Sequence, residues 1–444
     1  MPCYKTPQMS TSTNTKVSIG AAHGAGHMLG VLCGLAAGVW LGAAEAPTKL
    51  VTSGVSPYAI SLCMVSGVFV ARWTVPTMLK GTRSVFSDLA ANKHLLSSAI
   101  LAGMLWAVAN TLTVFAIRDV GLAIAFPLWN TNALVGLFWG WLLFGELRGT
   151  HGKNIAKVVL GAIAIAGAAA MLAFSTIHGQ GPQAGRAISG VLAAAGASLL
   201  WGTMYIPYRK AYISGMNPLS FVTVFTVGEL GTVLALTLAL DPKTRVALLH
   251  LHPPAAKPVL FWLFLGGFAW VIGDLFQQFA TKYLGIGRAI PLSNTNQLWG
   301  LAWGALVFGE LAHANWHQRA LVVAGSLVMI LGALAVSTAV ASEREHASTD
   351  RALERECLRF GLDYNRVLAA YLGDGAGDTA GRRGWLDYAI IAAAVGIFVF
   401  LALIARKPTL EMNYGWVWAL GVVLGVMAAV GGWGLLKSSK DGSG

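Results

Sequence analysis

One carboxylate in the sequence, Asp274, lies deep within a long apolar segment, beside the amides of Gln277 and Gln278. A charged side chain at the centre of a bilayer costs roughly 2.5–3.5 kcal/mol on insertion scales, and such residues usually mark transport or proton pathways. Asp274 is therefore a candidate proton-coupling group or an acceptor for a substrate hydroxyl. Arg72 also lies deep in an apolar segment, so the alternative is that it is a structural charge partner of Asp274.

A second carboxylate, Glu45, stands near the end of the first apolar segment, four residues before Lys49. This spacing permits an ordinary ion pair within one helix. Glu45 is the second candidate for proton coupling, and the local pair is its alternative. Arg72 itself either anchors a carboxylate or extends toward the membrane surface.

Two Asn-Thr-Asn triplets, at 130–132 and 294–296, fall some way into two other apolar segments, near the expected bilayer midplane. Pro127 and Pro291 precede them, and a proline removes a backbone donor and kinks or breaks a helix. A broken helix with free polar groups suits a hydroxyl-rich substrate. The alternative is that the amides hydrogen-bond between helices as packing contacts. The substrate-binding candidates from the triplets are Asn130, Asn132, Asn294 and Asn296.

Aromatic rings near these polar groups would suit a sugar, because its C–H groups pack on a ring face while its hydroxyls bond at the rim. Trp106 and Trp270 each lie one helical turn before a polar residue, Asn110 and Asp274 respectively, and so share its face. We expect substrate contacts from these tryptophans and Asn110, and also from Gln277, Trp129, Trp40 and Tyr205. Many of the 16 tryptophans must instead serve the core or the membrane interface.

The elements that must position these residues are membrane-spanning helices. Of the 444 residues, 56% are hydrophobic and only 11% are charged, whereas soluble domains carry about 25% charged residues. The apolar runs are about 20 residues long, the length that crosses a bilayer as a helix. Twelve such helices are predicted, near 28–47, 57–79, 96–117, 122–144, 155–176, 187–208, 219–240, 258–281, 286–308, 319–341, 386–405 and 415–436.

An internal repeat relates the two halves of the chain. Residues 121–147 align without a gap to residues 285–311, with 17 identities over 27 positions that include the proline, the polar triplet and the closing Gly-Glu-Leu. A weaker similarity relates the segments that begin at Trp40 and Trp201. The repeat unit holds five helices, and an odd number inverts the second copy across the membrane. Inverted repeats surrounding a midplane site are typical of transporters.

The predicted fold is therefore an all-α polytopic membrane protein: a ten-helix core of two inverted five-helix repeats and a C-terminal two-helix hairpin. Its parts are a polar N-terminal tail (1–27), the repeats (28–176 and 187–341), a polar linker (342–384) and the hairpin (385–436). Lys and Arg are more frequent on the side that holds both ends, which predicts that both termini are cytoplasmic. The basic excess, a net charge of +12, lacks the clustering that nucleic-acid binding requires.

The segment from Trp106 to Leu147 and its counterpart at 264–311 resemble the drug/metabolite transporter superfamily, and most closely its glucose/ribose porter branch, which includes the transmembrane protein 144 group. The resemblance covers about residues 28–340. It implies sugar transport by alternating access, coupled to protons. By the same resemblance, Trp106 and Asn110 match the motif of the third helix, and Pro127 with its triplet matches the fourth. Asp274 departs from the pattern, since a neutral polar residue is more usual there.

The expected function is the transport of a small neutral sugar of the glucose, ribose or rhamnose class, by proton symport through the cytoplasmic membrane. The alternatives are an exporter of amino acids or other metabolites with the same fold, and a membrane sensor or assembly protein that uses residues 342–436. The sequence has no HExxH, GxSxG or phosphate-binding motif, so we expect no enzyme, cofactor or metal site. The lipid bilayer, the sugar and the proton are the expected partners, without an obligate protein partner.

Overall fold

The structure is a computed structural model that describes residues 13–44, 46–49, 55–120, 125, 128–174, 184–249, 260–309, 311–312, 314–372, 383–405 and 411–441. The regular elements within these ranges are all helices. Ten of them are long and apolar enough to cross a membrane. The chain is an all-helical integral membrane protein, as the sequence predicts.

The helices of the first part of the chain are α1 (Thr13–Ala44), α2 (Ala46–Lys49), α3 (Pro57–Lys80), α4 (Thr82–Ala91), α5 (Leu96–Val120), α7 (Asn132–Phe144) and α8 (Gly152–Phe174). Those of the second part are α9 (Ala184–Ile213), α10 (Pro218–Leu240), α11 (Pro242–Leu249), α12 (Leu260–Leu284), α13 (Ile286–Ser293), α14 (Asn296–Ala302) and α15 (Trp316–Ser337). Last come α16 (Glu343–Phe360), α17 (Tyr364–Leu372), α18 (Trp385–Ile404) and α19 (Tyr414–Asp441). The first helix begins at Thr13, earlier than predicted, although its apolar span begins at Gly26.

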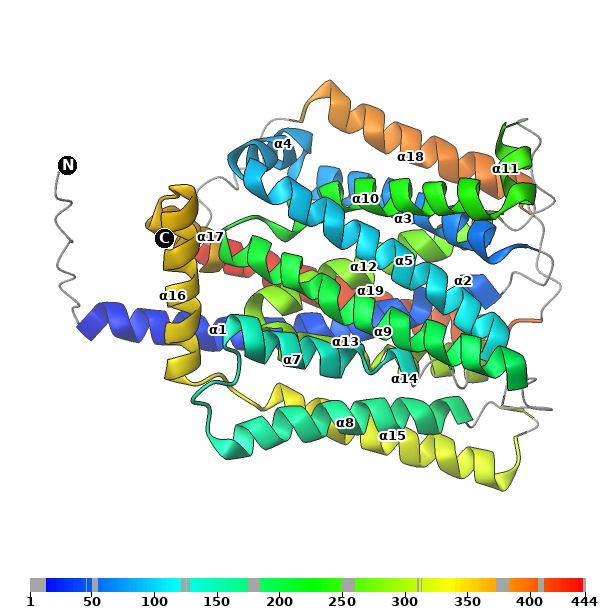
Figure 1. Ribbon diagram of the computed structural model, residues 1–444, viewed down its shortest axis with the longest axis horizontal. Coiled ribbons are helices and arrows are strands. Elements are labelled where there is room, and N and C mark those ends of the chain that lie inside the picture. Colours follow the sequence, from blue (N-terminus) through cyan, green and yellow to red (C-terminus); the bar gives the residue numbers. More distant parts are fainter. Residues whose placement is uncertain are drawn as a thin grey trace.

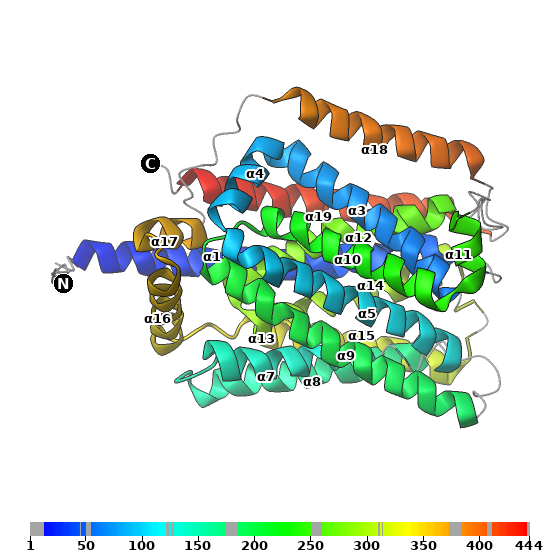
Figure 2. The same cartoon turned by 45° about the horizontal axis from the view of Figure 1, so that its top comes forward.

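The spanning helices lie side by side in one elongated bundle (Figure 1). Within it α1 packs against α12 and α5 packs against α9, while α3 and α10 pack against each other and against both α5 and α12. Helices α8 and α15 form a pair along one edge, and α18 runs along the opposite edge in both views (Figure 2). The centre of the bundle is therefore built by α3, α5, α9, α10 and α12.

Two of the twelve predicted helices are interrupted at their polar triplets. The predicted helix 286–308 consists of α13, a turn at Asn294 and Thr295, then α14, which ends in a π-helical turn at Trp303–Val307. The predicted helix 122–144 likewise has a turn at Asn130 and Thr131, after which α7 begins. In each turn the threonine hydroxyl donates to the carbonyl three residues back, at 2.6 Å and 2.7 Å. Pro291 lies inside α13, which continues to Ser293, so the helix is interrupted at the triplet and not at the proline itself; Pro127 lies outside the described residues.

Four glycines let the central helices approach each other closely. A Cβ added at Gly103 of α5 would lie 2.0 Å from the carbonyl oxygen of Phe225 on α10, and one at Gly267 of α12 would lie 2.0 Å from that of Met64 on α3. The same holds for Gly67 of α3 and Gly228 of α10, whose added Cβ atoms would lie 2.2 Å and 2.1 Å from the carbonyl oxygens of residues 264 and 100. Small residues at such crossings allow backbone contact between membrane helices.

The last two spanning helices pack on the core through separate faces. Phe398 of α18 makes edge-to-face ring contacts with Phe264 and Phe268 of α12, at 5.0 Å and 4.8 Å between centroids. Helix α19 packs against α1, where a Cβ added at Gly434 would lie 3.0 Å from the Leu29 side chain. The spans of both helices are largely exposed, which suits a lipid environment.

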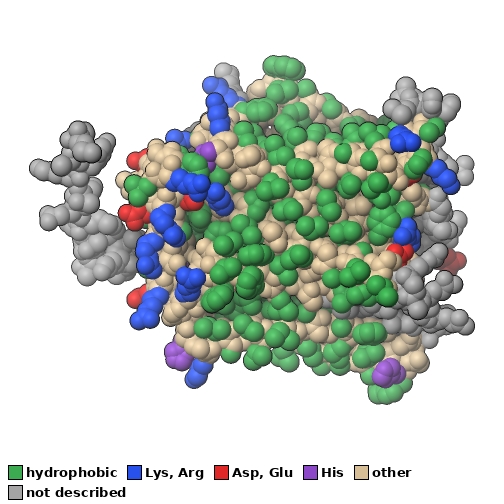
Figure 3. Space-filling model, in the orientation of Figure 1, with side chains coloured by type: hydrophobic (Ala, Val, Ile, Leu, Met, Phe, Trp, Pro, Cys, Tyr) green, Lys and Arg blue, Asp and Glu red, His purple; other side chains and the backbone are tan. Residues whose placement is uncertain are grey.

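The polar linker between α15 and α18 contains two helices of its own. Helix α16 lies across the end of the bundle, and α17 packs beside it (Figure 1). Lys and Arg side chains gather at this end, whereas hydrophobic side chains spread over the flank of the spanning helices (Figure 3). The linker is thus a folded cap over one end of the bundle.

Candidate functional site

A cluster of three charged side chains occupies the centre of the bundle. Arg72 of α3 donates from Nη2 to Oδ2 of Asp274 on α12 at 2.6 Å, and from Nη1 to Oε2 of Glu229 on α10 at 3.2 Å. All three side chains are fully buried. Asp274 and Arg72 are therefore partners, as the structural alternative in the sequence analysis supposed. That pairing leaves the second carboxylate, Glu229, to be explained.

The two carboxylates of the cluster differ in how well they are satisfied. The other oxygen of Asp274, Oδ1, accepts from the Gln278 amide at 3.0 Å. Gln278 in turn accepts from the Tyr212 hydroxyl, so Asp274 ends a chain of polar contacts that reaches α9. Oε1 of Glu229 has no hydrogen-bond partner among the described residues, and neither has Nε of Arg72. A buried polar atom without a partner costs about 1–3 kcal/mol.

Aromatic rings enclose the guanidinium of Arg72. Its Cζ lies 4.2 Å from the ring centre of Phe225 and 5.3 Å from that of Trp270. Trp270 meets Trp106 of α5 edge to face at 4.9 Å between centroids. The two tryptophans expected to hold a sugar are thus brought together, directly beside the charge cluster.

A layer of tyrosines on α9 completes this region. Tyr205 is buried and packs edge to face against Tyr208, which also packs against Phe225. The Tyr208 hydroxyl and the Trp106 indole nitrogen are buried and have no hydrogen-bond partner in the part of the chain that the structure describes. These orphaned donors face an apolar core, an arrangement that an added polar molecule would relieve.

The polar triplets meet each other at the junction of α7 and α13. The amide of Asn294 donates to the backbone carbonyl of Asn130 at 3.3 Å and to Oδ1 of Asn132 at 2.9 Å. These three residues are buried, and in this conformation they join the two broken helices. In this conformation the amides therefore act as packing contacts between helices, which was the alternative to substrate binding. Asn296 is half-buried and accepts from its neighbour Gln297.

The other predicted site residues lie in separate environments. The Asn110 amide donates to Ser61 of α3 at 3.0 Å, and the Gln277 amide donates to Ser293 of α13 at 2.6 Å. Trp129 packs edge to face with Trp201 at 6.0 Å, away from Trp106. Trp40 belongs to the apolar cluster around α1, and its buried Nε1 has no partner among the described residues. Glu45 lies outside the described residues.

Sequence reasoning missed Glu229, although the sequence carries a signal for it. Glu229 stands in the middle of the predicted helix 219–240, within the apolar run from Leu219 to Leu240. A lone intramembrane carboxylate there is as unusual as the one at Asp274. It could have been found by the same criterion that selected Asp274.

A second buried polar network anchors α16 to the end of the bundle. Arg288 of α13 donates to both carboxylate oxygens of Glu345, at 2.7 Å and 2.9 Å, and to the carbonyl of Ala339 at 2.9 Å. Thr150 also donates to Glu345. Burial alone would raise the pKa of Glu345, but the hydrogen bonds from Arg288 and the positive charge of that residue outweigh it and lower the pKa below 4.5. Glu345 is ionised at neutral pH, as its bidentate pair requires.

Glu146 closes the same region. It accepts from the backbone amides of Ile286 and Gly287, both at 2.8 Å, and so caps the start of α13. Arg209 of α9 lies 3.7 Å from Glu146 and donates to the carbonyl of Lys282 at the end of α12. These contacts give Glu146 a structural role at the start of α13. Its repeat counterpart, Glu310, lies outside the described residues.

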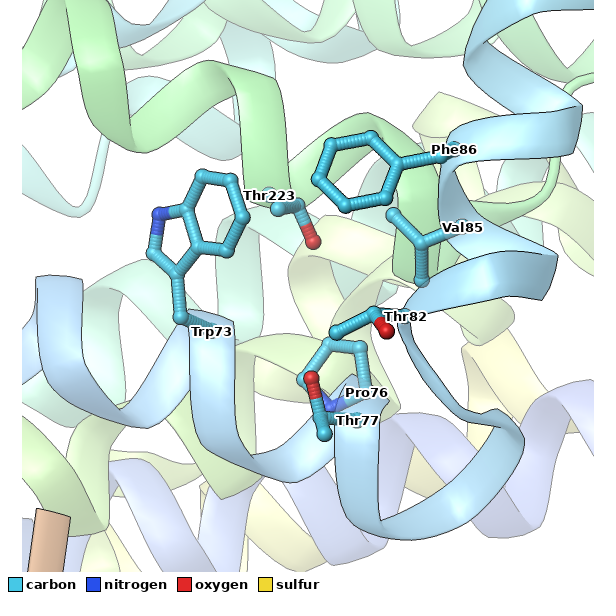
Figure 4. A pocket seen from close by; sticks show the side chains of 7 residues that line it. All are labelled: Trp73, Pro76, Thr77, Thr82, Val85, Phe86 and Thr223. Carbon is cyan, nitrogen blue, oxygen red and sulfur yellow. The ribbon is translucent and has the colours of Figure 1, made fainter. Parts of the chain in front are cut away.

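A small pocket opens between α3, α4 and α10, and Figure 4 shows its lining. Its polar side chains are Thr77, Thr82 and Thr223, and the Thr223 hydroxyl donates to the carbonyl of Arg72. None of the predicted site residues lines it. The pocket thus lies beside the charge cluster, without reaching the tryptophan pair.

Comparison with known proteins identifies the family. The model of the family described as "Sugar transport protein" matches residues 192–441. Proteins of Streptococcus pyogenes serotypes M1, M3 and M6, each named "Putative sugar uptake protein", are 34% identical over 134 residues, which is 30% of this chain and 39% of theirs. The match therefore spans about two fifths of the relatives' length. A solved structure titled "Crystal structure of protein" is 16% identical, with a TM-score of 0.45 over 67% of this chain and 95% of its own. Because the family model covers more than half of the chain, the protein belongs to the sugar transport protein family.

Proposed function

We propose that this protein carries a small neutral sugar of the glucose, ribose or rhamnose class across the cytoplasmic membrane together with a proton, by alternating access. Family membership and the names of the streptococcal relatives support the substrate class. The observation that carries the proposal is the Trp106–Trp270 pair, which lies beside a buried, charged cluster at the centre of the bundle.

The groups around the tryptophan pair suit a molecule with many hydroxyls. Trp106 and Tyr208 supply buried donors, and Glu229 a buried acceptor, that have no partner among the described residues. A sugar would satisfy them with its hydroxyls while its C–H faces pack on the indoles. The guanidinium of Arg72 is already engaged by two carboxylates, so an anionic substrate would meet a site of the wrong charge.

The proposed site consists of Trp106, Trp270, Asn110, Gln277 and Tyr205 around the substrate, with Asp274 and Arg72 in the proton-coupling cluster. In this conformation Asn110 and Gln277 donate to Ser61 and Ser293. We infer that the binding-competent state exchanges such side-chain contacts for substrate hydroxyls. Asn130, Asn132, Asn294 and Asn296 contribute where the two broken helices meet, and Trp129 and Trp40 at their edges.

Two inverted five-helix repeats would supply the alternating motion. The four glycine crossings support this, because they form two matching pairs. Gly103 of the first half approaches Phe225 of the second, and Gly267 of the second half approaches Met64 of the first. In the same way, Gly67 approaches Phe264 and Gly228 approaches Ile100. Helices α3 and α10 also begin alike, with Ser56 and Asn217 as caps before a first-turn proline. A Cβ added at Gly42 would lie 2.5 Å from the carbonyl oxygen of Asn296, and one added at Gly202 would lie 3.0 Å from that of Asn132, which supports the same relation.

We further propose that both termini and α16 face the cytoplasm. The start of the α1 span lies beside the end of the α19 span, since a Cβ added at Gly434 would lie 3.0 Å from the Leu29 side chain. The Lys and Arg side chains that gather at the end holding α16 and α17 (Figure 3) follow the bias of cytoplasmic segments.

Uptake into proteoliposomes tests the function. We expect labelled glucose, ribose or rhamnose to accumulate when an inward proton gradient is imposed, and only to equilibrate without one. The D274N variant should lose gradient-driven accumulation, because it removes the partner of Arg72. Flux of an amino acid or amine with no flux of any sugar would overturn the substrate class, and accumulation that ignores the gradient would overturn the coupling.

A further inference from the structure

The central cluster carries one negative charge too many for its surroundings. With both carboxylates ionised, Asp274 and Glu229 outnumber the single guanidinium of Arg72, and all three side chains are fully buried. A buried charge without compensation is so costly that such a group usually becomes neutral instead. One proton bound to either carboxylate removes the excess.

The hydrogen bonds decide which carboxylate binds that proton. Asp274 is held at both oxygens, by Arg72 at 2.6 Å and by Gln278 at 3.0 Å, and both contacts favour the ionised form. Glu229 has one longer contact to Arg72, at 3.2 Å, and its Oε1 has no partner among the described residues. These contacts favour an ionised Asp274 and a protonated Glu229.

Among the described residues, the helices packed around Glu229 bring only Arg72 and Asp274 as charges to its level. Arg72 faces it from α3 and Asp274 from α12, while α9 presents Tyr208, which packs on Phe225 one turn away. Helix α5 faces it with Gly103, whose added Cβ would lie 2.9 Å from the Glu229 amide nitrogen. Asp88 of α4 contacts Asn217 at the start of α10, and Arg245 of α11 contacts Leu238 near its end.

We propose that Glu229 is the group that takes up and releases the transported proton, and that Asp274 stays ionised as the fixed partner of Arg72. This inference rests on the proposed sugar–proton symport. In each cycle an O–H bond forms at Glu229 on the outer side and breaks on the inner side, so that one positive charge moves with one neutral sugar. The charge of Glu229 acts on the sugar site through Arg72, whose guanidinium lies over Trp270.

Infrared spectroscopy of the purified full-length protein tests where the proton lies. A protonated carboxyl has a C=O stretch that a carboxylate lacks, and the wild-type minus E229Q difference spectrum isolates the cluster. We expect this band at neutral pH, and we expect it to shift when the protein is labelled with side-chain ¹³C-glutamate but not with ¹³C-aspartate. A band that shifts with aspartate would place the proton on Asp274 and overturn the proposal. The absence of any band would overturn it too, since the cluster would then be fully ionised.

Transport by E229Q gives the second readout. We expect the variant to exchange labelled for unlabelled sugar without accumulating it above the external concentration under a proton gradient. The control E411Q makes the same chemical change at an exposed position and should accumulate sugar as the wild type does. Gradient-driven accumulation by E229Q would overturn the assignment. If the wild type moves no sugar at all, the proposed function fails, whereas the infrared result still decides the position of the proton.

Discussion

At the scale of single residues, the centre of the bundle combines three buried charges. Arg72, Asp274 and Glu229 lie there beside the rings of Phe225 and Trp270. Buried ion pairs rarely improve stability over apolar side chains of similar volume. Asp274 and Arg72 were chosen from the sequence as possible partners, and Glu229 could have been selected as an intramembrane carboxylate by the same criterion. That all three side chains meet needed the tertiary structure, because α3, α10 and α12 are brought together only by the fold.

This reasoning predicts opposite effects for removing one charge and for removing all three. The variant R72M leaves two carboxylates without their cation, and breaking a buried pair in this way typically costs about 3–5 kcal/mol. The triple variant R72M/E229Q/D274N leaves no charge, so we expect it to recover most of that loss while failing to accumulate sugar. Thermal unfolding in one detergent compares the two proteins. A triple variant as unstable as R72M would show that the cluster is structural.

At the scale of elements, the breaks at the polar triplets were predictable, whereas the docking of the linker was not. A proline and a polar triplet within an apolar run are local signals, so an interruption near 291–296 could be expected from the sequence, and the turn lies at 294–295. Residues 342–384 carry no comparable local signal of where α16 binds. Its position depends on Arg288, which lies 57 residues before Glu345 in the chain.

The α16 anchor makes a prediction that a thiol probe can check. Cys357 is buried in an apolar cluster with Ile213 and Val367, so it reacts only when α16 lifts from the bundle. In a background without the other cysteines, E345Q should speed its alkylation by roughly ten-fold or more, because hydrogen bonds to charged groups contribute about 1.5–3 kcal/mol.

The matched control for this experiment is R355Q, which changes an exposed residue of the same helix and should react like the wild type. The lowered pKa of Glu345 also predicts how the docking of α16 depends on pH. Its contribution to docking is complete above the unfolded pKa and is lost only as the pH falls below about 4.5. The wild-type rate, corrected for thiolate fraction, should therefore show no release of α16 across the neutral range. Equal rates for E345Q and wild type would mean that the apolar cluster alone holds the helix.

At the scale of the whole molecule, composition and hydropathy were enough to predict a helical membrane protein, because the bilayer sets helix length directly. Ten of the twelve predicted helices are spans by length and composition in the described residues, and the remaining two are the interrupted ones. Hydropathy could not predict which helices cross, because apolar residues have the same hydropathy whether they face lipid or the core. The glycines at the crossings indicate which helices pack closely, because backbones approach each other there.

The glycine crossings give a test of the proposed two-fold relation between the halves. Alanine at Gly103 or Gly267 would place a Cβ 2.0 Å from a carbonyl oxygen, so each pair of helices must move apart. Overpacking of this kind costs typically about 1–3 kcal/mol, which outweighs the gain of about 1 kcal/mol that alanine has over glycine within a helix. We expect G103A and G267A to lower thermal stability by similar amounts and G231A, which has open space around it, to lower it not at all. If one of the two equivalent variants were harmless while the other unfolded the protein, the halves would not pack as related repeats.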